Sequence, residues 1–183
     1  RTKGVFLVRK KDRGLIQVFT GNGKGKTSAA LGSILRATGH GLRVFIVFFM
    51  KGKYPYGEFS SLPALPNVEV ASFGLRCLID RSSINPEEIK EADLALQAGR
   101  EAMLSGKYDM VVLDEVNVAV YFNLIPLDDV IRLIEEKPPG VELILTGRYA
   151  EDAVIERADL VTEMRKVKHP FDNGVKARKG IEY

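Results

Sequence analysis

A glycine-rich loop near the start of the chain limits the possible folds more than any other feature. An apolar segment at residues 15–19 runs into Thr-Gly-Asn-Gly-Lys-Gly-Lys-Thr-Ser at residues 20–28, and helix-prone residues follow. Glycines let successive backbone N–H groups turn toward one anion, and the N-terminus of the next helix adds partial positive charge. The order of strand, loop and helix is typical of a P-loop, which predicts binding of a nucleoside triphosphate.

The residues of this loop have distinct expected roles. Lys26 supplies an ammonium for phosphate oxygens, and the Thr27 hydroxyl is a candidate Mg²⁺ ligand. The loop is one residue tighter than the usual spacing, because Thr20 stands where that pattern has its first glycine. The residues expected to bind the nucleotide are Gly21, Asn22, Gly23, Lys24, Gly25, Lys26, Thr27 and Ser28.

Alternating strand-like and helix-like segments predict an α/β fold of the P-loop NTPase (RecA-like) type, a mostly parallel sheet with helices on both faces. Continuous β-branched runs are typical of buried parallel strands. We expect strands at residues 15–19, 42–49, 68–72, 110–113, 141–146 and 160–164. We expect helices at residues 26–37, 86–104, 127–136 and 150–157. The proline-containing stretch 51–66 lacks periodicity and is predicted to be a loop near the P-loop.

The length of 183 residues fits one domain with a single core. We expect a P-loop α/β domain over residues 1–183, with an N-terminal segment at 1–14 and a loop-like tail at 167–183. The lone Cys77 excludes an intramolecular disulfide and suits a reducing compartment, so we expect a cytoplasmic protein. The longest apolar run, residues 44–50, is too short to cross a bilayer, and no secretory leader is recognisable, so we expect no membrane partner.

Two acids end the apolar strand predicted at residues 110–113. An acid after a strand in a P-loop protein reaches Mg²⁺ directly or through water. We expect Asp114 nearer the water shell of the metal, and Glu115 either as a metal ligand or at the substrate; the sequence does not separate these roles. The candidate metal ligands are therefore Thr27, Asp114 and Glu115.

Other basic residues are candidates for phosphate binding. Arg148 follows another predicted strand, where a guanidinium can bind phosphate oxygens bidentately or simply lie on the surface. Lys51 and Lys53 follow the second strand and either meet phosphate or are solvated. Basic clusters at residues 9–13 and 165–179 could bind nucleic acid, but with 8% aromatic residues and no Trp we favour solvation or a small anionic ligand.

Five blocks of the sequence, in order, resemble the ATP:cob(I)alamin adenosyltransferases of the corrinoid-salvage (CobA/BtuR) type. The short P-loop and the Lys-His-x-Phe-Asp-x-Gly-Val-Lys-Ala tail are the specific parts of the resemblance, whereas the acidic strand end is generic. The blocks are residues 18–27, 48–52 with 57–58, 111–115, 145–148 and 167–183.

The resemblance implies transfer of the 5′-deoxyadenosyl group of ATP to the cobalt of a reduced Co(I) corrinoid, with release of triphosphate. It implies ATP and a corrinoid as substrates, Mg²⁺ or Mn²⁺ as cofactor, and Lys26 and Glu115 as catalytic residues. It also implies a homodimer and a reductase or flavodoxin that supplies Co(I). Co(I) is itself a nucleophile, so no protein base is needed, and none is recognisable in the sequence.

One region departs from the family pattern. Members often carry a Phe and a Trp after the third strand that handle the corrinoid; here Phe73 stands in that region and the chain has no Trp. Two other functions stay open from the sequence alone. A P-loop kinase or ATPase would yield ADP. A RecA-like nucleic-acid-binding NTPase would bind DNA or RNA in a salt-sensitive way.

Overall fold

The computed structural model describes residues 13–52, 55–75 and 83–183 of the chain. Its strands form one six-stranded sheet in the order β3-β2-β4-β5-β1-β6, and each pairing is parallel. The α/β fold with a parallel sheet is therefore confirmed. Our interpretations of Lys53 and Cys77, and most of the N-terminal segment 1–14, concern residues outside the described ranges.

The strands lie within two residues of their predicted bounds. The side chains of β4 and β5 are buried along their whole length, because helices cover both faces of the sheet. The strands are β1 (Ile16–Thr20), β2 (Val44–Phe48), β3 (Val68–Ser72), β4 (Met110–Asp114), β5 (Glu142–Thr146) and β6 (Leu160–Glu163).

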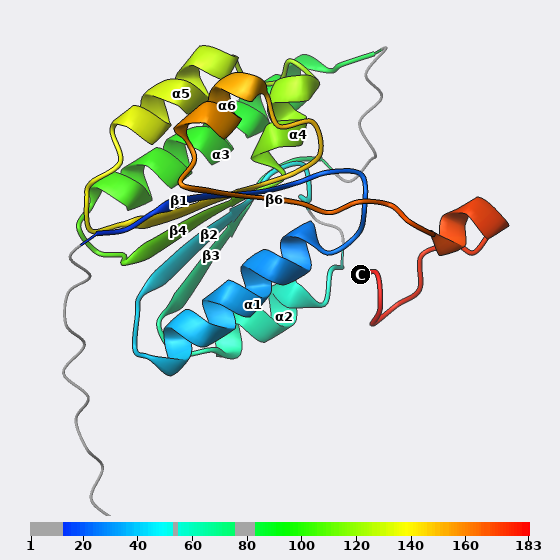
Figure 1. Ribbon diagram of the computed structural model, residues 1–183, viewed down its shortest axis with the longest axis horizontal. Coiled ribbons are helices and arrows are strands. Elements are labelled where there is room, and N and C mark those ends of the chain that lie inside the picture. Colours follow the sequence, from blue (N-terminus) through cyan, green and yellow to red (C-terminus); the bar gives the residue numbers. More distant parts are fainter. Residues whose placement is uncertain (1–12, 53–54, 76–82) are drawn as a thin grey trace, which may run out of the picture.

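The helices form two layers around the sheet (Figure 1). One face is covered by α1 (Lys26–Gly39) with the short α2 (Glu58–Ser61) and the 3₁₀ turn η1 (Leu62–Ala64). The other face is covered by α3 (Pro86–Leu104), α4 (Val116–Tyr121), α5 (Leu127–Glu135) and α6 (Asp152–Arg157). Side chains of β1 alternate between the two layers: Val18 packs toward α3–α6 and Phe19 toward α1.

The start of α3 follows from its local sequence. The Asn85 side chain accepts the Glu87 N–H at 2.9 Å, and the Glu88 carboxylate accepts the Asn85 N–H at 2.9 Å. This capping box, with Pro86 at the first helical position, satisfies N–H groups that the helix leaves open. The predicted bounds of this helix are confirmed at both ends.

Two parts of the prediction are wrong. Residues 58–64, expected in a loop, form α2 and η1, because Phe59 and Leu62 pack onto the core beneath α1. The helix α4 is absent from the prediction, since its valines favour strand locally; burial of Val116 and Ala119 beside the sheet overrides that preference.

The tail contains a short 3₁₀ turn, η2 (Pro170–Asn173). Among the described residues, none of the helices is long and apolar enough to span a membrane.

Candidate functional site

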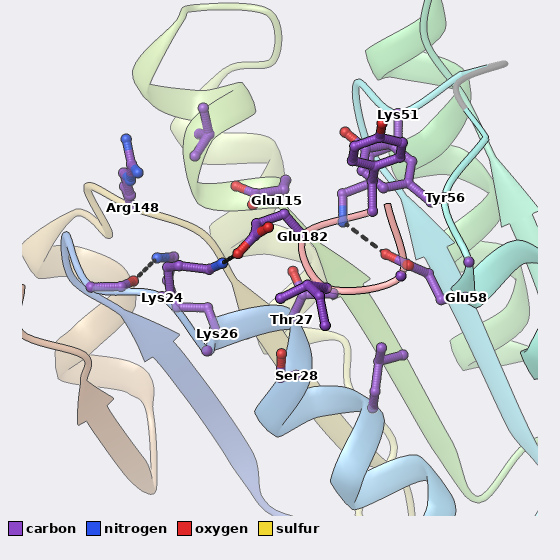
Figure 2. Close-up of a pocket in the computed structure, with 18 of the residues that line it drawn as sticks. Lys24, Lys26, Thr27, Ser28, Lys51, Tyr56, Glu58, Glu115, Arg148 and Glu182 are labelled. Atoms are coloured by element: carbon purple, nitrogen blue, oxygen red, sulfur yellow. Dashed lines mark hydrogen bonds and ion pairs between the residues drawn. The ribbon is translucent and has the colours of Figure 1, made fainter. Parts of the chain in front are cut away.

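A cavity of about 700 Å³ opens at the carboxyl edge of the sheet, where β1, β2, β4 and β5 end. In open parallel sheets this edge is where ligands bind. Figure 2 shows how side chains from separate strand ends face this space. The polar residues that line it include those of the P-loop at 23–28 together with Lys51, Tyr56, Glu58, Glu115, Arg148, Tyr149 and Glu182.

The P-loop is shaped by close contact with the segment that follows β6. The Gly23 N–H donates to the Met164 carbonyl at 2.6 Å. A Cβ on Gly21 would lie 2.5 Å from that carbonyl oxygen, and one on Gly23 would lie 2.7 Å from it. Glycine is therefore required at both positions, where no side chain fits between the two backbones.

Lys26 begins α1 and is held against the loop. Its Nζ donates to the Gly23 carbonyl at 2.6 Å, and the residue is only 7% exposed. Burial lowers the pKa of the Lys26 ammonium, and the nearby Arg148 acts in the same direction, whereas Glu115 and Asp114 oppose this change. A cation that has lost much of its water interacts strongly with an incoming phosphate.

The two acids after β4 point to different neighbours. Asp114 is fully buried: its Oδ1 accepts the Thr146 hydroxyl at 2.7 Å, and its Oδ2 lies 2.7 Å from Lys51 Nζ. Glu115 has a left-handed backbone with φ of 68° and lines the cavity. Burial, and next the charge of Asp114, raise the pKa of the Glu115 carboxyl, although Lys51, Lys26 and Arg148 partly offset this. The neighbouring cations favour the charged form of Glu115, as a bound metal would.

Lys51 is enclosed by acids and aromatic rings. Its Nζ lies 3.6 Å from a Glu58 carboxylate oxygen and 5.0 Å from the ring centroids of both Phe48 and Tyr56. Burial disfavours its charge, but the interactions with Asp114 and the charges of Glu115 and Glu58 together outweigh burial, so the pKa of Lys51 is raised. Lys51 is thus a buried ion-pair partner and not a solvated surface lysine.

Arg148 and Tyr149 follow β5 and line the cavity. Figure 2 shows Arg148 on the opposite side of the view from Lys51. Tyr149 has a positive φ of 61° and stacks on Tyr121, with ring centroids 4.0 Å apart. Arg148 is close enough to Lys26 and Glu115 to influence the pKa of both. The cations Lys26 and Arg148 therefore lie close to the acid Glu115.

The tail returns to the P-loop after its 3₁₀ turn (Figure 1). The Glu182 carboxylate lies 2.7 Å from Lys24 Nζ and also accepts hydrogen bonds from the backbone N–H and the guanidinium of Arg178. These bonds, first those of Arg178 and then that of Lys24, lower the pKa of Glu182 to about 2. The tail thus places a carboxylate at the P-loop (Figure 2).

Most of the predicted site residues meet at this cavity. The exceptions are Gly21 and Asn22, which precede its lining, and Asp114, which lies beneath it. Sequence reasoning missed Glu182, Glu58, Tyr56 and Tyr149. The first two belong to the blocks that carry the family resemblance, which is a usable signal, whereas neither tyrosine has one.

The acids of the cavity do not form a complete metal cage. Within residues 13–52, 55–75 and 83–183, the structure contains no cluster of three or more His, Cys, Asp or Glu side chains able to hold a metal ion. Thr27 and Glu115 both line the cavity and offer oxygen ligands of the kind that Mg²⁺ prefers. A metal there would complete its shell with phosphate oxygens and water, as Mg²⁺ usually does at nucleotide sites.

Comparisons with known proteins cover almost the whole chain. Residues 12–183 match the family model for ATP:corrinoid adenosyltransferase BtuR/CobO/CobP. The chain is 40% identical over 173 residues to the corrinoid adenosyltransferase of Escherichia coli strain K12 and 42% identical over 175 residues to that of Salmonella typhimurium strain LT2. Each alignment covers 94% of this chain and 87% of the relative. The corrinoid adenosyltransferase of Pseudomonas aeruginosa is 37% identical over 175 residues, with 94% of this chain and 85% of the relative covered.

The similar solved structures share the fold. The cytoplasmic domain of EssC superposes with a TM-score of 0.52 at 15% sequence identity, covering 91% of this chain and 34% of the EssC chain. ATPases 2 and 3 of EssC from Geobacillus thermodenitrificans give a TM-score of 0.50 at 13% identity, covering 91% of this chain and 35% of that one. At such low identity the likeness concerns architecture alone.

Proposed function

Because this chain belongs to the ATP:corrinoid adenosyltransferase family, and so carries out ATP-dependent adenosylation of a corrinoid, we propose that the cavity beside Lys26 and Glu115 is where that reaction takes place. ATP lies with its phosphates on the P-loop amides and the cations around them. The adenosyl carbon faces the corrinoid across the open side of the cavity.

The observation that carries this proposal is the gathering of Lys24, Lys26 and Arg148 around one cavity at the start of α1. Transfer of the 5′-deoxyadenosyl group leaves behind a triphosphate, which is a polyanion. Fixed cations, loop N–H groups and the N-terminus of α1 stabilise negative charge as it develops on that leaving group. Lys26 and Glu115 are the residues we propose as catalytic.

The protein has little covalent chemistry of its own to perform. Reduced cobalt is the nucleophile, and it attacks carbon without first losing a proton. What remains for the chain is to hold C5′ of ATP next to the cobalt and to neutralise the leaving oxygens. The residues we propose to bind the nucleotide are Gly21, Asn22, Gly23, Lys24, Gly25, Lys26, Thr27, Ser28 and Arg148.

The residues around Thr27 fit a divalent metal, Mg²⁺ or Mn²⁺. The Thr27 hydroxyl and the Glu115 carboxylate line the same cavity as the P-loop cations, so a metal–triphosphate complex meets oxygen ligands and charge-matched partners together. Such an ion, when bound, neutralises part of the phosphate charge. The sequence predicts that Asp114 lies in the water shell of this metal.

We extend the proposal to partners and location. Co(I) requires an electron donor, so a reductase or flavodoxin is proposed to deliver the electron in a cytoplasmic setting. We propose a homodimer, and we propose Phe73 as part of the corrinoid contact. Its backbone lies beside the cavity wall, because the Phe73 carbonyl accepts the N–H groups of Lys51 and Gly52, each at 3.1 Å.

Phosphorus NMR of a reaction with ATP, Mg²⁺ and a chemically reduced corrinoid tests the proposal. We expect inorganic triphosphate as the product, together with the absorption spectrum of an adenosylated corrinoid. The matched control omits the reductant, which leaves the cobalt non-nucleophilic and should give no product. Signals of ADP and orthophosphate with unmodified corrinoid would instead identify a kinase or ATPase and overturn the proposal.

A further inference from the structure

Protein groups contact both oxygens of the acid at the end of β4. Asp114 is fully buried; Oδ1 accepts the Thr146 hydroxyl at 2.7 Å, and Oδ2 lies 2.7 Å from Lys51 Nζ. The register of the sheet creates this pairing, because Phe48 at the end of β2 lies directly opposite Asp114 and Lys51 follows three residues later. An acid at this strand end ordinarily faces a metal or its water.

The Lys51 ammonium is fixed from several sides. Glu58 from α2 lies 3.6 Å away, and Tyr56 lies on the same side of the cavity (Figure 2). The rings of Phe48 and Tyr56 flank the charge, and the Lys51 side chain is 11% exposed. The Lys51 backbone N–H also donates to the Phe73 carbonyl at 3.1 Å. Opposite charges and ring faces stabilise a desolvated cation, so Lys51 has a defined position and not a mobile one.

We propose that Lys51 is a resident cation that takes the place beside Asp114 where a metal would otherwise bind, so that Asp114 is a positioning residue and Glu115 is the acid that faces the metal. The inference rests on the proposed function only in assigning a metal to Thr27 and Glu115. It changes our expectation for Asp114, whose part in the reaction is to hold Lys51.

The charge balance of the site explains why such a cation is useful. Two adjacent carboxylates with one metal would leave excess negative charge close to a triphosphate. An ammonium fixed on Asp114 cancels that charge, so the polyanion meets Lys24, Lys26, Arg148 and a single acid after β4 that lines the cavity, Glu115. Removing Lys51 alone would leave a buried carboxylate with no charge partner at Oδ2.

Metal binding separates the roles of the two acids. The electron paramagnetic resonance signal of free Mn²⁺ gives the affinity of each protein variant for Mn²⁺, with ATP present and with ATP absent. With ATP, we expect Asp114→Asn to bind Mn²⁺ within about twofold of the parent and Glu115→Gln to bind it about tenfold more weakly. Equal weakening in both variants would make Asp114 a metal ligand and overturn the proposal.

Removing the resident cation should open its position to a metal. Without ATP, we expect Lys51→Met to bind Mn²⁺ about tenfold more tightly than the parent, because Asp114 and Glu58 lose the ammonium that separates them. The double variant Lys51→Met/Asp114→Asn should lose this gain. An unchanged Mn²⁺ affinity in Lys51→Met would contradict the proposal, even if Glu115→Gln behaves as expected.

Thermal unfolding provides the structural control. Arg43 and Asp109 form a 3.3 Å ion pair near the opposite ends of the same two strands, but their side chains are 51% and 28% exposed. We expect Lys51→Met to lower the melting temperature more than Arg43→Met, and Asp114→Asn to recover part of that loss in the double variant. Glu115→Gln could leave the affinity for Mn²⁺ in the presence of ATP unchanged while Lys51→Met still binds Mn²⁺ more tightly. That result would refute the assignment of the metal to Thr27 and Glu115 but would support Lys51 as the resident cation beside Asp114.

Discussion

The Lys24 ammonium and the Glu182 carboxylate lie 2.7 Å apart although 158 residues separate them in the sequence. One belongs to the P-loop and the other to the tail. The Glu182 carboxylate therefore pairs with a lysine that we propose binds phosphate. A nucleotide that enters the cavity must compete with Glu182 for Lys24.

We expect Glu182→Gln to tighten ATP binding by about two- to fivefold, because the change removes a negative charge beside the triphosphate and releases Lys24. Isothermal titration calorimetry with ATP measures the effect. Asp172→Asn is the matched control, since Asp172 pairs with Lys166 elsewhere in the tail. Weaker ATP binding in Glu182→Gln would show that the tail holds the nucleotide in place. The pKa of Glu182 near 2 means that its carboxylate stays charged at pH 5 and above.

Lys26→Ala should lower ATP affinity by about 10- to 100-fold, because a charge-assisted hydrogen bond to phosphate contributes about 1.5–3 kcal/mol. The fold should persist, which circular dichroism checks. Lys107→Ala, a change at an exposed lysine outside the cavity, is the control and should bind ATP like the parent. Near-parental affinity in Lys26→Ala would remove Lys26 from the binding site.

The stability of the metal-free protein should depend on pH through Glu115. Its pKa is raised in the folded state by burial, so the folded protein binds this proton more tightly than the unfolded chain. Stability from this group is present below the unfolded pKa and is lost as pH rises through the raised folded pKa. Glu115→Gln should therefore raise the melting temperature at pH 8 in EDTA and have little effect near pH 4.5.

The control for this pH effect is Glu101→Gln, an exposed position on α3. Its melting temperature should follow the parent at each pH. A Glu115→Gln variant that gains stability equally at pH 8 and pH 4.5 would mean that ionisation of Glu115 is not the cause.

Gly21→Ala should destabilise the protein by about 1–3 kcal/mol and weaken ATP binding, because the new Cβ meets the Met164 carbonyl at a position with φ of 96°. Gly32→Ala, in the interior of α1 with open space around its Cβ, should instead stabilise by about 0.4–1 kcal/mol. Chemical denaturation measures both values. A neutral Gly21→Ala would mean that the loop has room to shift away from Met164.

The strand ends and the P-loop were predictable because their signals are local. A run such as residues 110–113 followed by two acids shows both the strand and the place where it ends. The roles of those acids were not predictable. Lys51 reaches the Asp114 carboxylate because the register of the sheet sets Phe48 opposite Asp114. No short sequence pattern indicates this register, so the ion pair could not be predicted.

The family resemblance drawn from five sequence blocks is confirmed by the match over residues 12–183. It rested on the short loop and the tail, and these two blocks meet in space, where Glu182 lies 2.7 Å from Lys24. By contrast, α4 gave no local signal, because its β-branched residues become helical only when packed against the sheet.

The position of β1 in the sheet has a consequence for how the protein is made. β1 is the first strand of the sheet in the sequence, yet its neighbours are β5 and β6, and its loop is fixed by the Met164 carbonyl. The N-terminal part of a nascent chain contains β1 and the P-loop sequence, but β5 and β6, the strands that pair with β1, have not yet been made. A ribosome-bound chain should therefore acquire a shaped phosphate-binding loop only after about residue 164 has emerged, so the segment translated early gains its function late.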